Sequence, residues 1–339
     1  MTTQVIRVEP QVRDFAFDHF WHFTAERQQI FLRRRTGAPG PWTEDPILAR
    51  YKFCNVYRAA DRVSQYLIRD VAYRDPAVSP DDLAFQVVAF RHFSNIATWN
   101  SVTDLLGHPP TLDDLASDRF EQALTVTRER NGGLYTGAFI LCATDAYGRR
   151  IKHLNHVELF RHMFLRTDLA GRIVDAGSLA LVFDELKQYP LMGDFMSYQI
   201  AIDLNYSPLI DFSEDDFTRP GPGAVRGLKK IFVHTGGRTP SELIMWLVER
   251  QERELAARGL SFSGLFGRRL HAIDVQNLLC EVDKYLRVAA PELASGRTRI
   301  KAMFRPDPAP VDLFFPPKWS LAPSGSDGGL DAAQELAAV

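Results

Sequence analysis

The most informative part of this sequence is the stretch 178–206, Ser178-Leu-Ala-Leu-Val-Phe-Asp-Glu-Leu-Lys-Gln-Tyr-Pro-Leu-Met-Gly-Asp-Phe-Met-Ser-Tyr-Gln-Ile-Ala-Ile-Asp-Leu-Asn-Tyr206. Apolar residues recur at helical spacing on both sides of a turn that contains Pro190 and Gly193. The start of a second helix presents free backbone N–H groups, which can bind a phosphate. The stretch therefore predicts a helix-hairpin-helix, although a purely structural helix pair explains the pattern equally well.

Helical spacing of apolar residues recurs along most of the chain on both sides of this hairpin. The predicted helices cover residues 18–35, 56–70, 83–95, 155–165, 241–258 and 274–288, with further starts near Asp45 and at Thr111. Asp81 and Ser241 are expected to cap two of them, and Thr111 with Asp114 forms a capping-box pattern. Residues 134–144 have the composition of a strand but no predicted partner strand, so a helix is favoured for their second half. The predicted fold class is mostly α-helical.

Composition indicates one folded domain followed by a tail. Of the 339 residues, 45% are hydrophobic, 24% are charged and 11% are aromatic, which is ordinary for a globular protein. After about Phe304 the sequence becomes rich in proline, and then in serine, glycine and aspartate. We therefore expect a helical domain over residues 15–317, with the hairpin at about 178–206, and disorder in residues 318–339.

Several classes of protein are disfavoured by what the sequence lacks. No stretch approaches the roughly 18 apolar residues of a membrane span, and the first residues form no signal core, so a cytoplasmic protein without membrane contact is expected. The three cysteines lack the spacing of a zinc site or a disulfide framework. There is no Gly-Lys-Ser phosphate loop, dinucleotide fingerprint, His-Glu-x-x-His helix or nucleophile elbow. Kinases, dehydrogenases and metalloproteases are therefore disfavoured, and no metal or cofactor is expected.

Basic residues follow the hairpin in the sequence, although the formal net charge of the chain is -2. An acidic cluster at 211–216 leads into a glycine turn and then into Arg226, Lys229 and Lys230. A local basic face is enough to bind phosphates whatever the net charge of the protein. These three residues are therefore candidates for DNA binding, and an ordinary solvated surface is the alternative. The candidates in the hairpin turn are Met192, Gly193 and Asp194.

A second polar pattern lies on the last predicted helix. Asp274, Asn277 and Glu281 follow one another at i, i+3 and i+7, which places them on one helical face. Their apolar neighbours indicate a half-buried polar network. The alternative is a set of ties between helices, with Asp274 acting as a helix cap.

A third pattern combines aromatic, amide and guanidinium groups. Residues 51–62 place Asn55, Arg58 and Asp61 on a common side, and residues 90–99 place Asn95 among aromatic residues. Such groups can stack on a nucleobase and form hydrogen bonds to its edge. A plain aromatic core is the commoner explanation of the same composition.

In this order, the patterns resemble the α-glutamyl/putrescinyl thymine pyrophosphorylase family, a helix-hairpin-helix group related to DNA glycosylases and linked to hypermodified phage DNA and to prokaryotic defence. The resemblance extends from about Phe20 to Pro317. Its motifs are Phe23-Thr-Ala-Glu-Arg27, Pro41-Trp-Thr-Glu-Asp-Pro-Ile-Leu48, Asn55-Val-Tyr-Arg-Ala-Ala-Asp-Arg62, Gly193-Asp-Phe-Met-Ser-Tyr-Gln199, Gly221-Pro-Gly-Ala224 and Asp274-Val-Gln-Asn-Leu-Leu-Cys-Glu-Val-Asp-Lys-Tyr285. The resemblance implies a DNA glycosylase-like fold with two helical halves around a base pocket.

The resemblance also implies roles for individual residues. In helix-hairpin-helix glycosylases, an aspartate that follows the hairpin faces the sugar of the flipped nucleotide, which implies a catalytic Asp216. This residue lies somewhat further from the hairpin than is usual, so Asp211 and Asp215 remain rivals, and Asp274 is a second catalytic candidate. The implied base pocket contains Arg58, Asp61, Asn95, Asn277 and Glu281.

The expected reaction follows from one departure from the pattern. Bifunctional glycosylases carry a lysine two residues after the last glycine of the hairpin, and this chain has Phe195 there. A monofunctional DNA N-glycosylase is therefore expected, which would flip a bulky modified pyrimidine out of double-stranded phage DNA and leave an abasic site as antiviral defence. Two alternatives stay open: an enzyme that replaces a pyrophosphate on 5-hydroxymethyluracil with an amine, and a non-catalytic module that binds modified DNA. No obligatory protein partner is expected.

Overall fold

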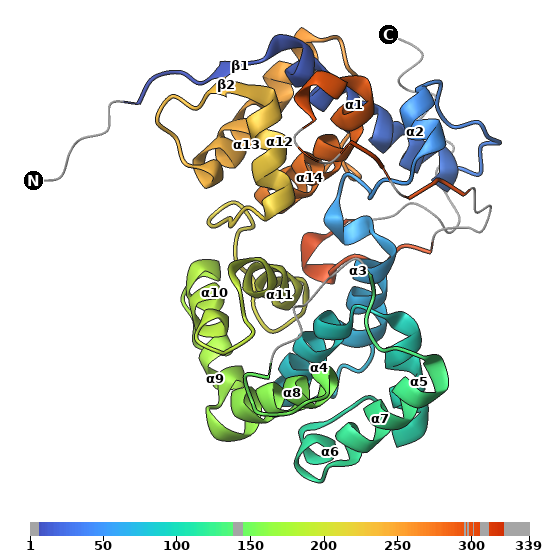
Figure 1. Cartoon of the computed structure of the whole chain (residues 1–339), viewed down its shortest axis with the longest axis vertical. Helices are drawn as coiled ribbons and strands as arrows, with labels where there is room; N and C mark the ends of the chain where they lie inside the picture. The colour runs from blue at the N-terminus through green and yellow to red at the C-terminus, as the bar shows by residue number, and fades with distance from the viewer. Residues whose placement is uncertain are drawn as a thin grey trace, which may run out of the picture.

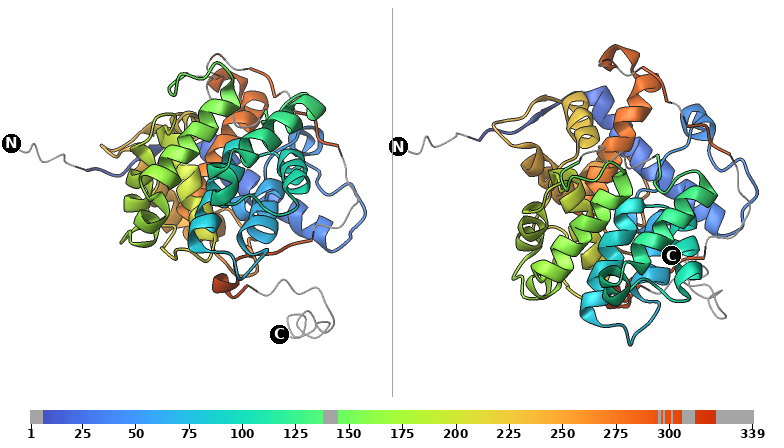
Figure 2. Two further views of the ribbon diagram at one scale, coloured as in Figure 1. Left: turned by 90° about the horizontal axis from the view of Figure 1, so that it is seen from below. Right: turned by 60° about the horizontal axis from the view of Figure 1, so that its bottom comes forward.

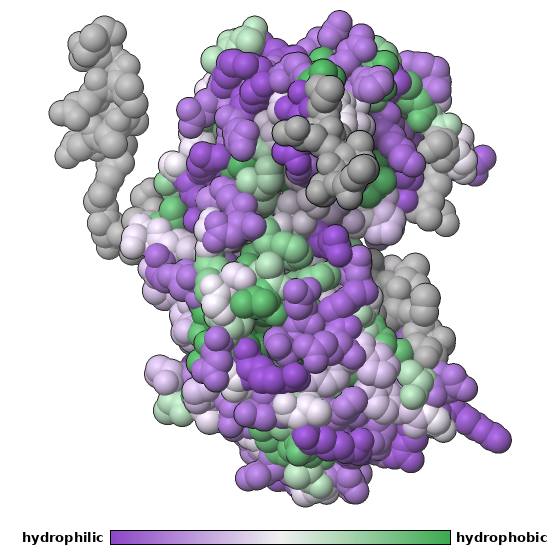
Figure 3. Space-filling model, turned by 90° about the vertical axis from the view of Figure 1, so that its left-hand side faces the viewer, coloured by the Kyte–Doolittle hydropathy of each residue, from purple (hydrophilic) through white to green (hydrophobic). Residues whose placement is uncertain are grey.

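The computed structural model describes residues 7–137, 145–294, 296, 298–300, 302–305 and 312–321. This part of the chain is mostly α-helical and contains one small antiparallel sheet of two strands, so the predicted fold class is confirmed. The helices form an upper and a lower body (Figure 1). The outline of the molecule narrows between them (Figure 3).

The upper body is built from both ends of the described chain. It contains β1 (Gln11–Val12), α1 (Asp14–Arg35), α2 (Pro46–Arg50), α12 (Pro222–Ile231), β2 (Phe232–His234), α13 (Pro240–Ala257) and α14 (Ala272–Ala289). Two glycines allow α12 to lie close against α14, because a side chain at Gly223 would meet the Cys280 sulfur and one at Gly227 would meet the Leu279 carbonyl. This contact fixes α14, which carries several of the candidate site residues.

The lower body is a continuous segment of the chain. It contains α3 (Arg62–Tyr66), α4 (Pro80–Phe93), α5 (Ile96–Leu106), α6 (Leu112–Ala116), α7 (Arg119–Asn131), α8 (Lys152–Phe160), α9 (Leu169–Val174), α10 (Leu179–Lys187) and α11 (Asp194–Tyr206). Two further views show these teal and green helices grouped together, with the orange α14 beyond them (Figure 2). Helices α4 and α11 are buried along most of their length and form the centre of this body.

One predicted capping signal located a helix start correctly, because Thr111 with Asp114 forms the predicted capping box of α6. Helix α10 begins after Ser178, whose side chain accepts a hydrogen bond from Leu181 N. The predicted helix pair is present as α10 and α11, joined by residues 188–193. Of the stretch 134–144, residues 138–144 lie outside the described part of the chain, as do residues 322–339 of the expected tail.

Two predicted caps were wrong for the same reason. Helix α4 is capped by Ser79 rather than Asp81, and α13 is capped by Thr239 rather than Ser241. In both helices a proline occupies the first turn, where its missing N–H and fixed φ are favourable, so the cap is the residue directly before that proline. The single helix predicted for residues 56–70 is instead a 3-10 turn (Arg58–Ala60) followed by α3 and a wider π-helical turn (Leu67–Ala72).

A C-terminal segment packs against the junction between the two bodies. Trp319, in the short 3-10 helix Pro317–Trp319, meets the Tyr206 ring edge-on at 5.3 Å between ring centroids. The Lys318 ammonium donates a hydrogen bond of 2.9 Å to the Ser207 carbonyl. These contacts hold part of residues 318–321 on the folded domain. None of the described helices is long and apolar enough to cross a membrane.

Candidate functional site

A buried ion pair joins the lower body to the segment that leads into it from the upper body. The guanidinium of Arg58 lies 2.8 Å from the Asp203 carboxylate (Nη1 to Oδ1) and donates a 2.9 Å hydrogen bond to the Gln199 side chain. Arg91 donates to the same carboxylate, at 2.9 Å from Nη2 to Oδ1. Burial acts to lower the pKa of Arg58, but the charge of Asp203 raises it overall. Arg58 is therefore a charged residue whose guanidinium is held in a buried ion pair.

Asp274 connects this ion pair to the start of α14. Its carboxylate accepts hydrogen bonds from the backbone N–H of Arg58, at 3.0 Å, and of His271, at 3.1 Å. Burial raises its pKa, and the hydrogen bond from His271 only partly offsets this. The sequence left open whether Asp274 is catalytic or a helix cap; its bond from the His271 N–H belongs to a capping box, and its bond from the Arg58 N–H ties α14 to another segment.

The acidic segment 211–216 contains one buried carboxylate that the sequence analysis did not single out. Glu214 is buried and lies 2.7 Å from Arg268, and burial raises its pKa to about 7 despite that partner. Asp215 accepts hydrogen bonds from His271 Nδ1, at 3.0 Å, and from the Ala272 amide, at 2.9 Å. No local signal marks Glu214, because its partner is 54 residues away in the sequence.

The other two candidates in this segment are at the surface. Asp211 and Asp216 are both exposed. Asp211 lies 3.6 Å from the Lys318 ammonium. Within the described residues, the side chain of Asp216 makes no hydrogen bond or ion pair. A catalytic role for Asp216 would need a substrate that reaches it from solvent.

A half-exposed polar cluster surrounds Asn55, and we call it the Asn55 cluster. The Asn55 backbone N–H donates to Asp61 Oδ1 at 2.8 Å, and its backbone carbonyl accepts from Asn277 Nδ2 at 2.8 Å. Its side-chain oxygen accepts from Arg27 Nη2 at 2.6 Å. Residues from α1, from the start of α3 and from α14 therefore meet at one point between the bodies.

Glu281 holds the backbone next to this cluster in place. It is buried, it accepts a hydrogen bond of 3.2 Å from the Cys54 amide, and it pairs with the Lys284 ammonium. The residue thus fixes the backbone directly before Asn55. We regard Glu281 as a positioning residue.

Two acceptor atoms of the Asn55 cluster have no hydrogen-bond partner among the described residues, and both belong to partly exposed side chains. In the described part of the chain, neither Oδ2 of Asp61 nor Oδ1 of Asn277 accepts a hydrogen bond. Burial raises the pKa of Asp61 to about 6. The hydrogen bond from the Asn55 N–H acts to lower this pKa, and the negative charge of Glu281 acts to raise it. Asp61 is therefore mostly ionised at neutral pH and can still take up a proton.

The predicted base-pocket residues are thus only partly brought together. Asp61, Asn277 and Glu281 belong to the Asn55 cluster, and Arg58 lies next to it with its guanidinium in the buried ion pair. Asn95 caps α5 in the lower body, where its side-chain oxygen accepts from Ala97 N at 3.1 Å.

The turn between α10 and α11 does not offer a simple anion site. Met192 is buried, and Gly193 is the residue directly before α11. The carboxylate of Asp194 lies on the first turn of α11 and pairs with Lys187 and Arg219, at 2.5 and 3.3 Å. Its negative charge opposes a phosphate at the same helix end.

The basic residues of α12 differ in availability. Lys230 is buried and lies 3.1 Å from Asp283, and Arg226 lies 3.2 Å from the same carboxylate while staying partly exposed. Lys229 is exposed, and its ammonium pairs with none of the described residues. Lys229 and Arg226 are therefore the cations of this helix that can contact a phosphate.

No described group of three or more His, Cys, Asp or Glu residues could hold a metal ion. The Asn55 cluster is a partly exposed polar cluster with one titratable carboxylate, that of Asp61, whose pKa is raised by burial. The chemistry available at the Asn55 cluster is hydrogen bonding and proton transfer.

Comparisons with known proteins identify relatives of the chain. A family model described as "5-hmdU DNA kinase, helical domain" matches residues 14–295. Among curated proteins, the 5-hmdU DNA kinase of Bacillus phage SP10 is 25% identical over 306 residues, which covers 85% of this chain and 47% of that protein. The chain thus spans about half the length of the curated relative it matches. No solved structure matches it.

These matches overturn the predicted reaction. A monofunctional glycosylase that hydrolyses modified bases out of phage DNA as antiviral defence was expected, but the matching relative is named a DNA kinase, which is a transferase. The expectation was wrong because the order of the motifs indicates kinship, whereas the bond that reacts depends on groups that the motifs do not specify. The matching relative comes from a phage and is named for a modified nucleoside in DNA.

Proposed function

The chain belongs to the family described as the helical domain of 5-hmdU DNA kinase, and from this membership we propose that it acts on DNA that carries 5-hydroxymethyl-2′-deoxyuridine. In this proposal the chain binds the modified base at the Asn55 cluster. It holds the 5-hydroxymethyl oxygen there as the acceptor of a transferred group. In the proposed transfer, these residues bind the molecule that receives the group. A role in binding the donor's phosphates is not assigned to them, since the sequence has no Gly-Lys-Ser loop of the kind that binds nucleotide phosphates.

The observation that carries the proposal is the pair of unused acceptors on either side of Asn55. Asp61 binds the N–H of Asn55 and Asn277 binds its carbonyl, so their free oxygens belong to the same small site. 5-Hydroxymethyluracil presents two donors, its ring N3–H and its hydroxyl O–H, whereas thymine presents only the first. An acceptor at each position would distinguish the two bases.

Access to the base requires that it leave the duplex. We propose that the chain flips the base out of the duplex, as helix-hairpin-helix glycosylases do. Flipping costs a few kcal/mol. Double-stranded DNA is then the proposed partner. Lys229 and the partly exposed Arg226 are placed to contact its phosphates, and Asp283 holds Arg226 in position.

Asp61 supplies the chemistry in this proposal. With a pKa of about 6, its carboxylate is mostly ionised at neutral pH. A hydroxyl that attacks phosphorus must lose its proton, and a carboxylate hydrogen-bonded to that hydroxyl can accept it. The same carboxylate could accept the proton of an amine that displaces pyrophosphate from the 5-methylene, which keeps that transfer as a second candidate. The third candidate function is that of a module that binds modified DNA without catalysing a reaction.

The test compares binding to three duplexes that differ at one position, 5-hydroxymethyluracil, thymine or uracil. Fluorescence anisotropy measures the affinity, and ATP with Mg²⁺ is then added before digestion to nucleosides and mass spectrometry. We expect the 5-hydroxymethyluracil duplex to bind at least about tenfold more tightly, which corresponds to about 1.4 kcal/mol for one satisfied polar group.

Asp61→Asn is the diagnostic variant and Asp216→Asn is its matched control, because Asp216 is exposed. Asp61→Asn is expected to lose the preference for the modified duplex, while Asp216→Asn keeps it. Equal affinity for the three duplexes would reject the proposal, as would an equal loss in both variants. A phosphorylated nucleoside among the products identifies phosphoryl transfer, and an aminated one, formed when the base bears a pyrophosphate, identifies the second candidate.

A further inference from the structure

One residue of the Asn55 cluster has an unused hydrogen-bond donor. The guanidinium of Arg27 donates from Nε to the Cys54 carbonyl, at 3.0 Å, and from Nη2 to the Asn55 side-chain oxygen, at 2.6 Å. Its third nitrogen, Nη1, is enclosed and forms no hydrogen bond with any described residue. An enclosed N–H without a partner costs free energy, because its hydrogen bonds to water are lost and nothing replaces them. A partner for this donor is therefore worth seeking beside the cluster.

Three hydrogen-bonding atoms without a partner among the described residues surround Asn55. This residue holds each of the side chains that carry them, since its backbone N–H binds Asp61, its backbone carbonyl binds Asn277 and its side-chain oxygen binds Arg27. All three side chains belong to partly exposed residues. The atoms left over are the acceptor Oδ2 of Asp61, the acceptor Oδ1 of Asn277 and the donor Nη1 of Arg27. One residue thus fixes two acceptors and one donor.

One edge of 5-hydroxymethyluracil presents the complementary set of groups. The N3–H donor, the O4 acceptor and the O–H donor of the 5-hydroxymethyl group follow one another along this edge. 5-Hydroxymethylcytosine has the same hydroxymethyl group, but an amino group replaces O4 and N3 is an acceptor. A donor that faces another donor leaves both groups unpaired, and a site built on hydrogen bonds discriminates strongly against such a base.

We propose that Arg27 donates a hydrogen bond to O4 of the flipped base and so restricts the site to uracil-type bases. The inference rests on the proposed function, since it concerns the same base in the same cluster. Asn277 then accepts from N3–H and Asp61 accepts from the hydroxyl, which follows the order of the groups along the base. The proposal includes a turn of the guanidinium toward the entering base, because Nη1 is enclosed in the structure.

The experiment changes only the O4 atom of the base. Two DNA duplexes carry either 5-hydroxymethyluracil or its 4-thio derivative, opposite an abasic position so that base pairing does not affect the cost of flipping. Sulfur is a weaker hydrogen-bond acceptor than oxygen, whereas the N3–H and the hydroxyl are kept. Fluorescence anisotropy at pH 7 is expected to show that the full chain binds the 4-thio duplex at least about fivefold more weakly.

Arg27→Lys is the diagnostic variant. An ammonium keeps the charge but lacks the planar fork with which a guanidinium can bind the Cys54 carbonyl, Asn55 and O4 together. The variant is expected to bind the two duplexes equally. A purely structural role of Arg27 would weaken the binding of both duplexes by the same factor, so the ratio of the two affinities distinguishes recognition of O4 from support of the fold.

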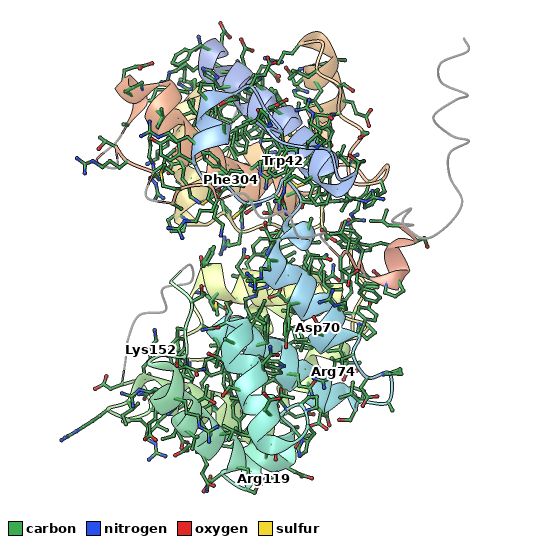
Figure 4. All side chains as sticks on the ribbon, turned by 90° about the vertical axis from the view of Figure 1, so that its right-hand side faces the viewer. Trp42, Asp70, Arg74, Arg119, Lys152 and Phe304 are labelled. Carbon is green, nitrogen blue, oxygen red and sulfur yellow. The ribbon has the colours of Figure 1, made fainter. Side chains whose placement is uncertain are left out.

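Arg33→Lys is the matched control, because Arg33 is an exposed arginine on the same helix, α1. Its guanidinium binds the Glu26 carboxylate, at 3.1 Å, and the Trp42 carbonyl, at 2.6 Å, and neither partner belongs to the Asn55 cluster. Trp42 lies beside Phe304 on the upper body (Figure 4). The control is expected to distinguish the two duplexes as well as the unchanged chain does.

The result that would overturn the proposal does not depend on the folding of any variant. Equal affinity of the unchanged chain for the two duplexes would overturn it, as would a preference that persists in Arg27→Lys or is lost equally in Arg33→Lys. Failure of the proposed function gives a different result. Equal affinity for 5-hydroxymethyluracil and thymine would remove the role of Asp61, whereas thymine and 4-thiothymine would still be distinguished through Arg27.

Discussion

Arg58 and Asp203 form an ion pair of 2.8 Å in which both side chains are almost completely withdrawn from solvent. The chain leaves the upper body through the segment that contains Arg58. The ion pair connects this segment with α11 of the lower body. Arg58 also fixes the start of α14, since its backbone N–H donates to Asp274. The positions of Asp61 and Asn277 in the Asn55 cluster therefore depend on a charge that is buried nearby.

Removal of the Asp203 carboxylate is expected to destabilise the fold strongly. Asp203→Ala leaves the guanidinium groups of Arg58 and Arg91 buried without their anion, and the loss of one partner from a buried pair costs about 3–5 kcal/mol. Urea denaturation followed by circular dichroism measures the change. Asp216→Ala, at an exposed site, should change the free energy of unfolding by less than about 0.5 kcal/mol. A similarly small effect for Asp203→Ala would show that water or rearrangement satisfies the two arginines.

A second prediction concerns the contact between α12 and α14. Alanine is normally better than glycine inside a helix by about 1 kcal/mol, but at Gly227 the Leu279 carbonyl of α14 occupies the space of the new methyl group. Gly227→Ala is therefore expected to lower the free energy of unfolding by about 1–3 kcal/mol. Gly133→Ala is the control, because no atom lies within 4 Å of its would-be Cβ. Unchanged stability of Gly227→Ala would mean that the two helices separate readily.

Stability should also respond to pH through His22 and Asp45, whose side chains lie 3.0 Å apart. The hydrogen bond to Asp45 raises the pKa of His22 above 6.5, so the contribution of His22 is complete below pH 6.5 and is lost as the pH rises through the raised value. Burial acts to raise the pKa of Asp45, but His22 and other donors lower it to about 2, so its contribution is lost only as the pH falls from 3.8 toward 2.

The expected outcome is that His22→Gln lowers the Tm more at pH 5 than at pH 8. Melting curves of both proteins at the two pH values test this. His108→Gln is the control variant, because the His108 side chain also lies near a carboxylate, that of Asp114 at 3.6 Å, but is 43% exposed and beyond hydrogen-bond distance of it, so its loss should change the Tm little at either pH. An equal effect of His22→Gln at pH 5 and pH 8 would contradict the assignment.

Local sequence signals predicted the helices better than the site. The pair Thr111 and Asp114 marked a helix start because a cap and its target lie within three residues of each other. Patterns within single segments also gave three members of the Asn55 cluster, Asp61, Asn277 and Glu281, of which Asp61 and Asn277 are hydrogen-bonded to the Asn55 backbone. Such patterns could not show that the backbone of Asn55 brings these two residues together.

Sequence patterns could not identify the partners of the buried charged residues. Glu214 and Arg268 are 54 residues apart, and Arg58 and Gln199 are 141 apart, so only the fold makes them neighbours. Asp216 was chosen from its distance to the hairpin, and the fold leaves it at the surface. Spacing along the chain cannot show which of several adjacent acids faces inward.

The preference for the modified base should depend on pH if Asp61 accepts the hydroxyl proton. The 5-hydroxymethyl O–H is a donor, so it binds the ionised carboxylate better than the protonated acid. With a pKa of about 6, Asp61 passes from mostly protonated at pH 5 to mostly ionised at pH 7. The ratio of affinities for 5-hydroxymethyluracil and thymine duplexes is therefore expected to increase several-fold between these pH values. In Asp61→Asn, which cannot ionise, the ratio should stay low and constant. Both duplexes carry the same phosphates, so any pH dependence of contacts to the DNA backbone cancels in the ratio of affinities. If the ratio rises equally in Asp61→Asn, the titrating group is not Asp61.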